Sequence, residues 1–274
     1  MGNLLKVDEL QIELVTASGV IRAVDGVSFC IDAGETVTII GESGSGKSTT
    51  AMGILGLLPD DLAVLSGSVQ FKDCEVLGNS KALGEVRGKH IALIPQDPMT
   101  ALSPVHTIGN QLREAVRHSG VKGKAAETAR AVELLEQVRI PQPATQLAKY
   151  PHQLSGGMLQ RVLIAGALAA GPELIIADEP TSALDVTVQA SILDLLLELQ
   201  ERTGIGMLVI THDLGVARLM SDRIYVMRNG AFVENGDAED LVRRPQSAYT
   251  KKLLDAVPVL GPWSAAPTTA GVPA

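Results

Sequence analysis

The sequence predicts a layered α/β protein built on a mostly parallel sheet. Short runs of apolar and β-branched residues recur along the chain, and amphipathic helical patterns separate them. Short runs without polar alternation are typical of strands that are buried on both faces, as in parallel sheets. The alternation of such strands with helices indicates an open sheet that helices cover on both sides.

The composition is that of a globular protein without a strongly basic surface. Of the 274 residues 46% are apolar, which is enough for one large domain or a domain with an inserted lobe. The formal net charge is −8 and no run of Lys and Arg is long, so nucleic acid is not an expected partner. The two cysteines, Cys30 and Cys74, lack metal-ligand spacing and are expected to be reduced thiols. The longest apolar run, Val162–Ala170, is too short to cross a bilayer.

Four apolar runs are predicted to form the parallel sheet. They are Thr36–Ile40, Ile91–Ile94, Leu174–Ala177 and Met207–Thr211. Two earlier segments, Leu4–Val15 and Val27–Ile31, are expected to be antiparallel strands. The dipeptide Asn229-Gly230 indicates a hairpin towards the other end of the chain.

Helical periodicity fills the intervals between these strands. A helix is expected over Thr50–Leu58, another over Ile108–His118, and a third begins near Ala125. The third has one apolar face, and so does a later helix. The faces consist of Ala131, Leu134, Leu135 and Val138 in one case and of Val188, Ile192, Leu195, Leu196 and Leu199 in the other.

A glycine-rich loop follows the first predicted parallel strand. Residues 41–49 fit the phosphate-loop pattern G-x-x-x-x-G-K-[ST] at every fixed position. The glycines let successive N–H groups point at phosphates, and a helix that begins near Gly46 adds the positive end of its dipole. Lys47 is expected to reach the β- and γ-phosphates of a nucleotide, and the Ser48 hydroxyl to ligate Mg²⁺. The expected nucleotide contacts are Gly41, Ser43, Gly44, Ser45, Gly46, Lys47, Ser48 and Thr49.

A second apolar strand ends in two carboxylates, Asp178 and Glu179. Neighbouring side chains of a strand point in opposite directions, so these two can have different roles at the edge of the sheet. Asp178 is expected to bind Mg²⁺, directly or through water, and Glu179 to polarise the water that attacks the γ-phosphate. Alone, the segment would be interpreted as a strand with a solvated turn after it. The phosphate loop favours the catalytic interpretation.

The segment Leu154-Ser155-Gly156-Gly157-Met158 precedes that strand and opens a helix that is expected to run through Leu168. Ser155 is expected to cap this helix, and the two glycines let a second phosphate approach its N–H groups. In isolation such a segment is more often a flexible turn. Here it resembles the signature sequence L-S-G-G-Q of the ATP-binding-cassette (ABC) ATPases, and the resemblance extends over about residues 4 to 255.

Other motifs of that family occur in the expected order. Gln96 matches the Q-loop glutamine, which contacts Mg²⁺ and the attacking water, and Ser182–Asp185 matches the D-loop. His212 matches the switch histidine that contacts the γ-phosphate. The resemblance thus implies an ATPase with Glu179, His212 and Gln96 as catalytic residues. The nucleotide would also contact Asp178, and the Mg²⁺ ligands would be Ser48, Gln96 and Asp178.

The resemblance also implies a fold and an assembly. The fold is that of a P-loop NTPase (RecA-like), with a mostly parallel core, an antiparallel β subdomain and an inserted α-helical subdomain. Core and β subdomain would occupy about residues 1–96 and 163–230, the helical subdomain 97–162 and a C-terminal extension 231–255. Residues 256–274, rich in Pro, Ala, Gly and Thr, are expected to be a poorly ordered tail. In a head-to-tail dimer the partner's ATP would be contacted in trans by Ser155, Gly156, Gly157 and Asp185.

Two positions depart from the family pattern. Met158 stands where the signature usually has glutamine, so one polar contact to the partner's nucleotide is expected to be missing. The stretch Ala17–Ile21 has no aromatic residue where the family places a ring against adenine. Stacking of a base on a ring contributes ~1–3 kcal/mol in related contacts, so loose base selectivity is expected.

Three segments resemble one group of the family, the peptide and nickel importers. They are Gln96–Pro104, Ser182–Ala190 and Ala248–Leu254. In that group the ATPase works with a second ATPase subunit, identical or different, two membrane permease subunits and an external solute-binding protein. It would lie on the cytoplasmic face of the membrane, held by the permeases, and its helical subdomain would receive a coupling helix from them. No cysteine follows Cys74, so the iron–sulfur cluster of some members is not expected.

Alternative functions remain open at this point. An ABC exporter would have a similar motor, because motor sequences carry little information about the direction of transport. ABC ATPases of DNA repair, chromosome structure or the ribosome usually have a second cassette, a long insertion or a basic surface, none of which is seen in this sequence. A kinase with a phosphate loop would lack the Ser155 signature and His212.

Overall fold

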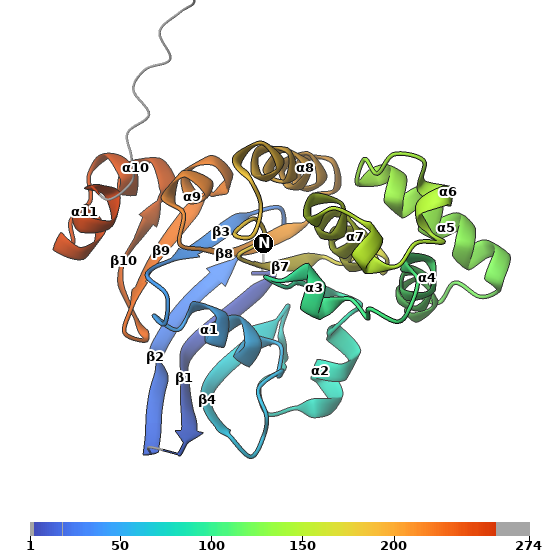
Figure 1. Cartoon of the computed structure of the whole chain (residues 1–274). Coiled ribbons are helices and arrows are strands. Elements are labelled where there is room, and N and C mark those ends of the chain that lie inside the picture. The colour runs from blue at the N-terminus through green and yellow to red at the C-terminus, as the bar shows by residue number, and fades with distance from the viewer. Residues whose placement is uncertain (1–2, 18, 256–274) are drawn as a thin grey trace, which may run out of the picture.

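A six-stranded sheet forms the centre of the protein (Figure 1). The computed structural model describes residues 3–17 and 19–255. The strand order is β10-β9-β3-β8-β7-β6, and all neighbours are parallel except β10 and β9. The four predicted parallel strands are confirmed, two of them with one more residue. The strands are β3 (Thr36–Ile40), β6 (Ile91–Ile94), β7 (Leu174–Asp178), β8 (Gly206–Thr211), β9 (Arg223–Arg228) and β10 (Ala231–Asp237).

A second, antiparallel sheet of four strands contains the N-terminal part of the chain. Its order is β2-β1-β4-β5. In β1, Leu5, Val7, Leu10 and Ile12 are buried, and together with Val37, Ile39 and Ile176 of the central sheet they belong to one apolar cluster. This burial holds the two sheets together. The strands are β1 (Leu5–Thr16), β2 (Gly19–Ile31), β4 (Ala63–Phe71) and β5 (Cys74–Glu75).

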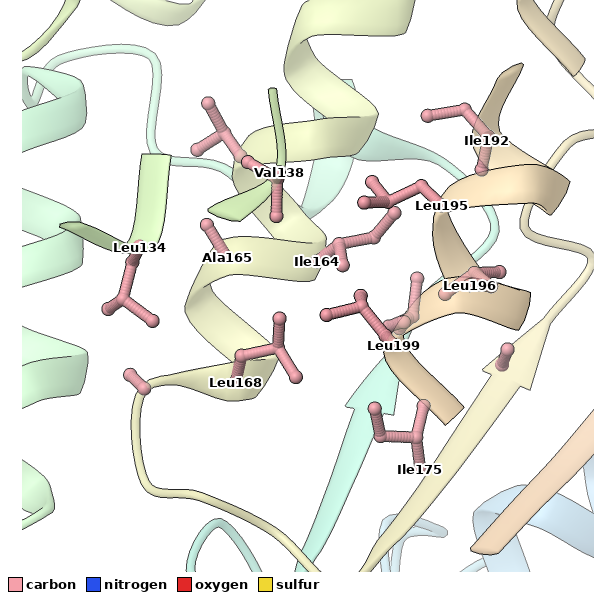
Figure 2. Packing of buried hydrophobic residues seen from close by; sticks show 14 of the residues in the cluster. Leu134, Val138, Ile164, Ala165, Leu168, Ile175, Ile192, Leu195, Leu196 and Leu199 are labelled. Atoms are coloured by element: carbon pink, nitrogen blue, oxygen red, sulfur yellow. The ribbon is translucent and has the colours of Figure 1, made fainter. Parts of the chain in front are cut away.

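A lobe of helices lies beside the central sheet, and its apolar residues share one core with the helices that cover the sheet. Figure 2 shows Leu134 of α5 (Lys124–Gln137) and its C-cap Val138 next to Ile164, Ala165 and Leu168 of α7 (Gly156–Leu168). Leu195 and Leu199 of α8 (Val186–Thr203) lie beyond them. The predicted apolar faces of α5 and α8 are therefore both in this core. The lobe contains α3 (Pro98–Ala101), α4 (Ile108–His118), α5 (Lys124–Gln137), α6 (Pro143–Gln146), the 3₁₀ helix Pro151–Gln153 and α7 (Gly156–Leu168).

Six more helices connect or cover the strands. The helix expected over Thr50–Leu58 ends earlier than predicted, at Ile54. The reason is Gly56, whose φ of +57° ends the helix in the left-handed region, while the Leu57 N–H donates to the Met52 carbonyl. These helices are α1 (Lys47–Ile54), α2 (Ser80–Val86), α8 (Val186–Thr203), α9 (Leu214–Met220), α10 (Ala238–Arg243) and α11 (Ala248–Asp255).

One of the expected subdomain boundaries cuts through a helix, and another separates two paired strands of the central sheet. Helix α7 crosses the boundary expected between residues 162 and 163, because it packs on both the lobe and α8. Strand β10, expected in a C-terminal extension, is an edge strand of the central sheet. It pairs with β9 across the predicted hairpin, in which Asn229 and Gly230 have φ of 49° and 84°. The expected tail, 256–274, lies outside the described residues. Among those that are described, no helix is long and apolar enough to span a membrane.

Candidate active site

The glycine-rich loop lies between the end of β3 and the start of α1. Lys47 is the first residue of α1, and Gly46 is its N-cap with φ of +107°. A Cβ atom at Gly46 would lie 2.4 Å from the Ala23 carbonyl oxygen, and one at Gly41 would lie 2.2 Å from the Met227 carbonyl oxygen. Both positions therefore require glycine. The loop is therefore pressed against β2 and β9 and leads into the N-terminus of α1, where backbone N–H groups without intrahelical partners are suited to bind phosphates.

Lys47 lies across this loop and is almost fully buried. Its Nζ atom donates to the carbonyl oxygens of Gly41 and Glu42, both at 2.9 Å. Burial lowers the pKa of the Lys47 ammonium group, and the carboxylates of Glu179 and Asp178 oppose that shift. The sequence therefore places a cation inside the curl of the loop, where a polyphosphate would be its natural counter-ion.

Ser48 and Asp178 form a pair of oxygen donors next to Lys47. The Ser48 hydroxyl donates to Asp178 Oδ1 at 2.9 Å. Burial raises the pKa of Asp178 and the hydrogen bond from Ser48 lowers it, with a net upward direction. A divalent cation would offset the cost of burying this carboxylate. Hydroxyl and carboxylate oxygens are the ligands that Mg²⁺ prefers.

The Glu179 carboxylate is fixed between two polar side chains from distant segments. Gln96 Nε2 donates to Glu179 Oε2 at 3.0 Å, and His212 Nδ1 lies 3.1 Å from Glu179 Oε1. The backbone of Glu179 has φ of +46°, a left-handed conformation that costs a residue with a side chain of order 1–3 kcal/mol. The fold retains this strain at the end of β7, where the side chain turns towards Gln96 and His212.

Apart from Asp178, these groups line one cavity of about 550 Å³. Ser45 lies below its surface, with a buried hydroxyl that has no hydrogen-bond partner among the described residues. A glycine-rich loop at the N-terminus of a helix and a buried ammonium group fit a nucleotide polyphosphate. The cavity is lined by Gly41, Glu42, Ser43, Gly44, Gly46, Lys47, Ser48, Thr49, Gln96, Glu179, His212 and Leu253.

The protein provides only part of a metal site. Among the described residues, no three His, Cys, Asp or Glu side chains converge in a metal-binding group. A Mg²⁺ ion held by Ser48, Asp178 and Gln96 would therefore need phosphate oxygens or water to complete its six ligands. That is the usual arrangement of Mg²⁺ in nucleotide sites.

The four residues expected to act in trans lie elsewhere. Ser155 is exposed and caps α7, with the Met158 N–H donating to its Oγ at 3.4 Å. Asp185 caps α8 through the Val188 N–H at 3.0 Å. A Cβ atom at Gly157 would lie 2.5 Å from Val188 Cγ1, so glycine allows α7 and α8 to meet. None of these residues, nor Gly156, lines the cavity of the same chain.

The stretch that is expected to meet the base, Ala17–Ile21, contains no aromatic residue. Ala17 is exposed at the turn between β1 and β2, and Val20 and Ile21 are 63% and 52% exposed. Ser18 lies outside the described residues. Phe29, Tyr225 and Phe232 pack on one another instead. The residues that line the cavity include no Phe, Tyr or Trp.

GTP is therefore expected to compete with ATP with a Kd within about tenfold, since a stacked ring is worth ~1–3 kcal/mol. The converse change, Ala17→Tyr, should tighten ATP binding by about tenfold, as measured by nucleotide competition. Val64→Tyr, a similar addition at a 60% exposed position of β4, should leave binding unchanged. Strict preference of the unmodified chain for ATP would contradict the expectation.

Two site residues escaped the sequence analysis, Tyr249 and Leu253 of α11. Leu253 lines the cavity, and the Tyr249 hydroxyl accepts a hydrogen bond from the Glu42 N–H. Both belong to the segment Ala248–Leu254, which was noted only for its resemblance to one family group. Because this segment is about 200 residues from the phosphate loop along the chain, no local pattern in the sequence indicates the contact.

Comparison with known proteins places this site in a family. Residues 24–182 match the ABC transporter family. The chain is 49% identical over 257 residues to "Probable peptide ABC transporter ATP-binding protein y4tR" of Sinorhizobium fredii, covering 93% of this chain and 77% of that protein. It is 47% identical to "Dipeptide transport ATP-binding protein DppD" of Bacillus subtilis, covering 95% and 78%.

A solved structure has the same fold. It is the dimeric ATP-binding cassette MJ0796 in a post-hydrolysis state bound to ADP and Pi, with TM-score 0.75 and 31% identity, covering 85% of this chain and 98% of that one. The predicted P-loop NTPase fold is thus confirmed, and so is the resemblance drawn from the motifs. The chain belongs to the ABC transporter family and is one of its ATPases.

Proposed function

We propose that this chain is the ATP-hydrolysing subunit of a membrane importer that transports peptides. The observation that carries the proposal is the fixed Glu179 carboxylate, which Gln96 and His212 hold at the rim of a phosphate-binding cavity. Relatives at 45–49% identity are named peptide, dipeptide and oligopeptide transport ATP-binding proteins, which favours peptides as cargo. Nickel and metal chelates, also expected from the resemblance, have no such support.

The side chains divide the chemistry among them. The loop N–H groups and Lys47 would bind the β- and γ-phosphates, and Ser48, Asp178 and Gln96 would hold Mg²⁺. When bound, that ion would neutralise charge that develops on the phosphate oxygens. The Glu179 carboxylate would accept a proton from the attacking water. Gln96 and His212 would keep this carboxylate in place. His212 would also donate to the γ-phosphate.

A complete site requires two chains. Ser155, Gly156, Gly157 and Asp185 are exposed or half-buried and stay outside the cavity of their own chain. The N-terminus of α7, with two glycines, is suited to approach the nucleotide of a second cassette. A head-to-tail dimer would bring the two halves together, and the related dimeric cassette bound to ADP and Pi supports this assembly. The partner is a second ABC ATPase subunit, identical or different.

An apolar groove would receive the membrane partner. A cavity of about 480 Å³ lies between the central sheet and the lateral helices, and its lining includes Leu57, Ala115, Leu163 and Ala167. An amphipathic helix that lays its apolar face into such a groove is a common recognition mode. We assign this groove to a short helix of one permease subunit, and the same groove of the second cassette would receive a helix of the other permease. The chain would then lie peripherally on the cytoplasmic face of the membrane, with a solute-binding protein acting on the far side.

Leu57 offers a direct test of the groove. Its side chain lines the groove and is 42% exposed, so Leu57→Arg should fold normally but no longer co-purify with the permease subunits. Leu219→Arg, at a 57% exposed leucine of α9 outside the groove, is the control and should co-purify as before. Thermal unfolding checks that both variants are folded. Retention of Leu57→Arg in the complex would refute the groove as the docking site. The proposed cargo is tested separately, by peptide uptake into vesicles that contain the unmodified complex, and absence of uptake would refute it.

A further inference from the structure

The C-terminal helix α11 lies against the phosphate loop. The backbone N–H of Glu42, the second residue of the loop, donates to the Tyr249 hydroxyl oxygen at 3.3 Å. One turn further along α11, Leu253 lines the cavity together with Lys47 and His212. Two residues on one face of this helix therefore meet the nucleotide site, although 207 positions separate Tyr249 from Glu42.

The Tyr249 ring is fixed in place by its surroundings. It is 7% exposed and belongs to an apolar cluster with Ile40, the residue directly before the phosphate loop. The guanidinium carbon of Arg228 lies 4.8 Å from the centre of the ring. Because packing fixes the ring, its hydroxyl is a rigid acceptor for the loop and not a mobile surface group.

The start of α11 is also anchored. The Glu234 carboxylate of β10 accepts hydrogen bonds from the backbone N–H groups of Gln246 at 2.7 Å and Ser247 at 3.0 Å. A carboxylate in this position satisfies N–H groups before the first turn and interacts favourably with the helix dipole. The helix thus connects the edge strand of the central sheet to the phosphate loop.

We infer that α11 is part of the nucleotide site, with Tyr249 as a positioning residue for the phosphate loop and Leu253 as a contact to the nucleotide. The inference rests on the proposed function, since it requires that the cavity binds ATP. The loop must hold several N–H groups in one orientation to bind phosphates. The hydrogen bond from the Glu42 N–H to the Tyr249 hydroxyl fixes one peptide group of the loop and so restricts the conformation of the residues that follow it.

Coupling between the two elements must be reciprocal. If docked α11 favours ATP binding, bound ATP must favour docked α11 by the same factor. The presence or absence of bound nucleotide would therefore change how firmly α11 is docked, as far as its last turn. Slower hydrogen exchange of α11 amides in the presence of ATP and Mg²⁺ is the expected signature, and unchanged exchange would contradict the coupling.

Tyr249→Phe isolates the hydroxyl, because the ring and its packing remain. A hydrogen bond of this kind corresponds to a factor of about 2–10 in an equilibrium constant, so the Kd for ATP should rise by about that factor. The melting temperature without nucleotide should fall only slightly, because one hydrogen bond to an exposed loop residue is lost. Tyr225→Phe is the matched control: its hydroxyl accepts from Arg223 Nη1 at 3.4 Å, away from the cavity, and its Kd should be unchanged.

A leucine pair gives a second, independent comparison. Leu253 and Leu254 are both half-buried against the same apolar cluster, but Leu254 does not line the cavity. Alanine at either position should lower the melting temperature similarly, whereas only Leu253→Ala should also weaken ATP binding. Wild-type affinity in both Tyr249→Phe and Leu253→Ala would overturn the inference and leave the proposed function intact. Failure of the unmodified chain to bind ATP would overturn both.

Discussion

Glu179→Gln is expected to lower the rate of ATP hydrolysis by about 10²–10⁴-fold, the usual contribution of a positioned general base. Glutamine has nearly the same shape and can still contact Gln96 and His212, but it cannot accept a proton from water. The Kd for ATP should therefore change little. Phosphate release under saturating ATP and Mg²⁺ measures the rate, and a titration with a fluorescent nucleotide measures binding.

The control for this change is Glu85→Gln on α2. It makes the same substitution at an exposed glutamate that lies outside the cavity, and its rate should equal that of the unmodified chain. A Glu179→Gln variant that hydrolyses ATP at the normal rate would show that another group activates the water. The proposed division of labour at the site would then be wrong.

Ser155→Arg is expected to abolish an ATP-dependent dimer of the Glu179→Gln protein. Without hydrolysis the closed dimer should persist, because bound nucleotide adds contacts only in the closed state. An arginine at the exposed cap of α7 would place a long side chain where the partner's phosphates approach. Loss of the cap itself costs only about 1 kcal/mol, so each chain should remain folded. Gel filtration with and without ATP and Mg²⁺ measures the effect.

Ser119→Arg provides the matched control. Ser119 is another exposed serine at a helix end of the same lobe, but it follows α4 and does not belong to the signature segment. That variant should dimerise normally. If the Glu179→Gln protein binds ATP but stays monomeric, the cassette pairs with a different subunit, and the Ser155 test must be made in the isolated complex. Dimerisation of the Ser155→Arg variant would exclude α7 from the interface.

Some features of the molecule follow from local sequence alone. The phosphate loop, the cap at Ser155 and the hairpin at Asn229-Gly230 each depend on a few adjacent residues with restricted conformations. Continuous apolar runs gave the buried strands, and helical periodicity gave the faces of α5 and α8. Matching motifs in a fixed order then gave the family, which the comparisons confirm.

The catalytic arrangement depends on tertiary structure. Gln96 and Glu179 are 83 residues apart, and they meet because β6 and β7 are parallel neighbours whose carboxyl ends share one edge. The left-handed backbone conformation of Glu179 cannot be predicted from the neighbouring residues. Residue preferences describe favourable conformations, whereas this strained one is maintained by the surrounding fold.

Motif spacing in the sequence thus determined the chemistry and the family of this protein. The contact of α11 with the phosphate loop and the place of β10 in the central sheet were decided only by the tertiary structure. The physical reason is that short-range patterns fix which segments are helices and strands. The mutual burial of distant apolar faces fixes which segments meet, and Tyr249 reaches Glu42 only through such packing on Ile40.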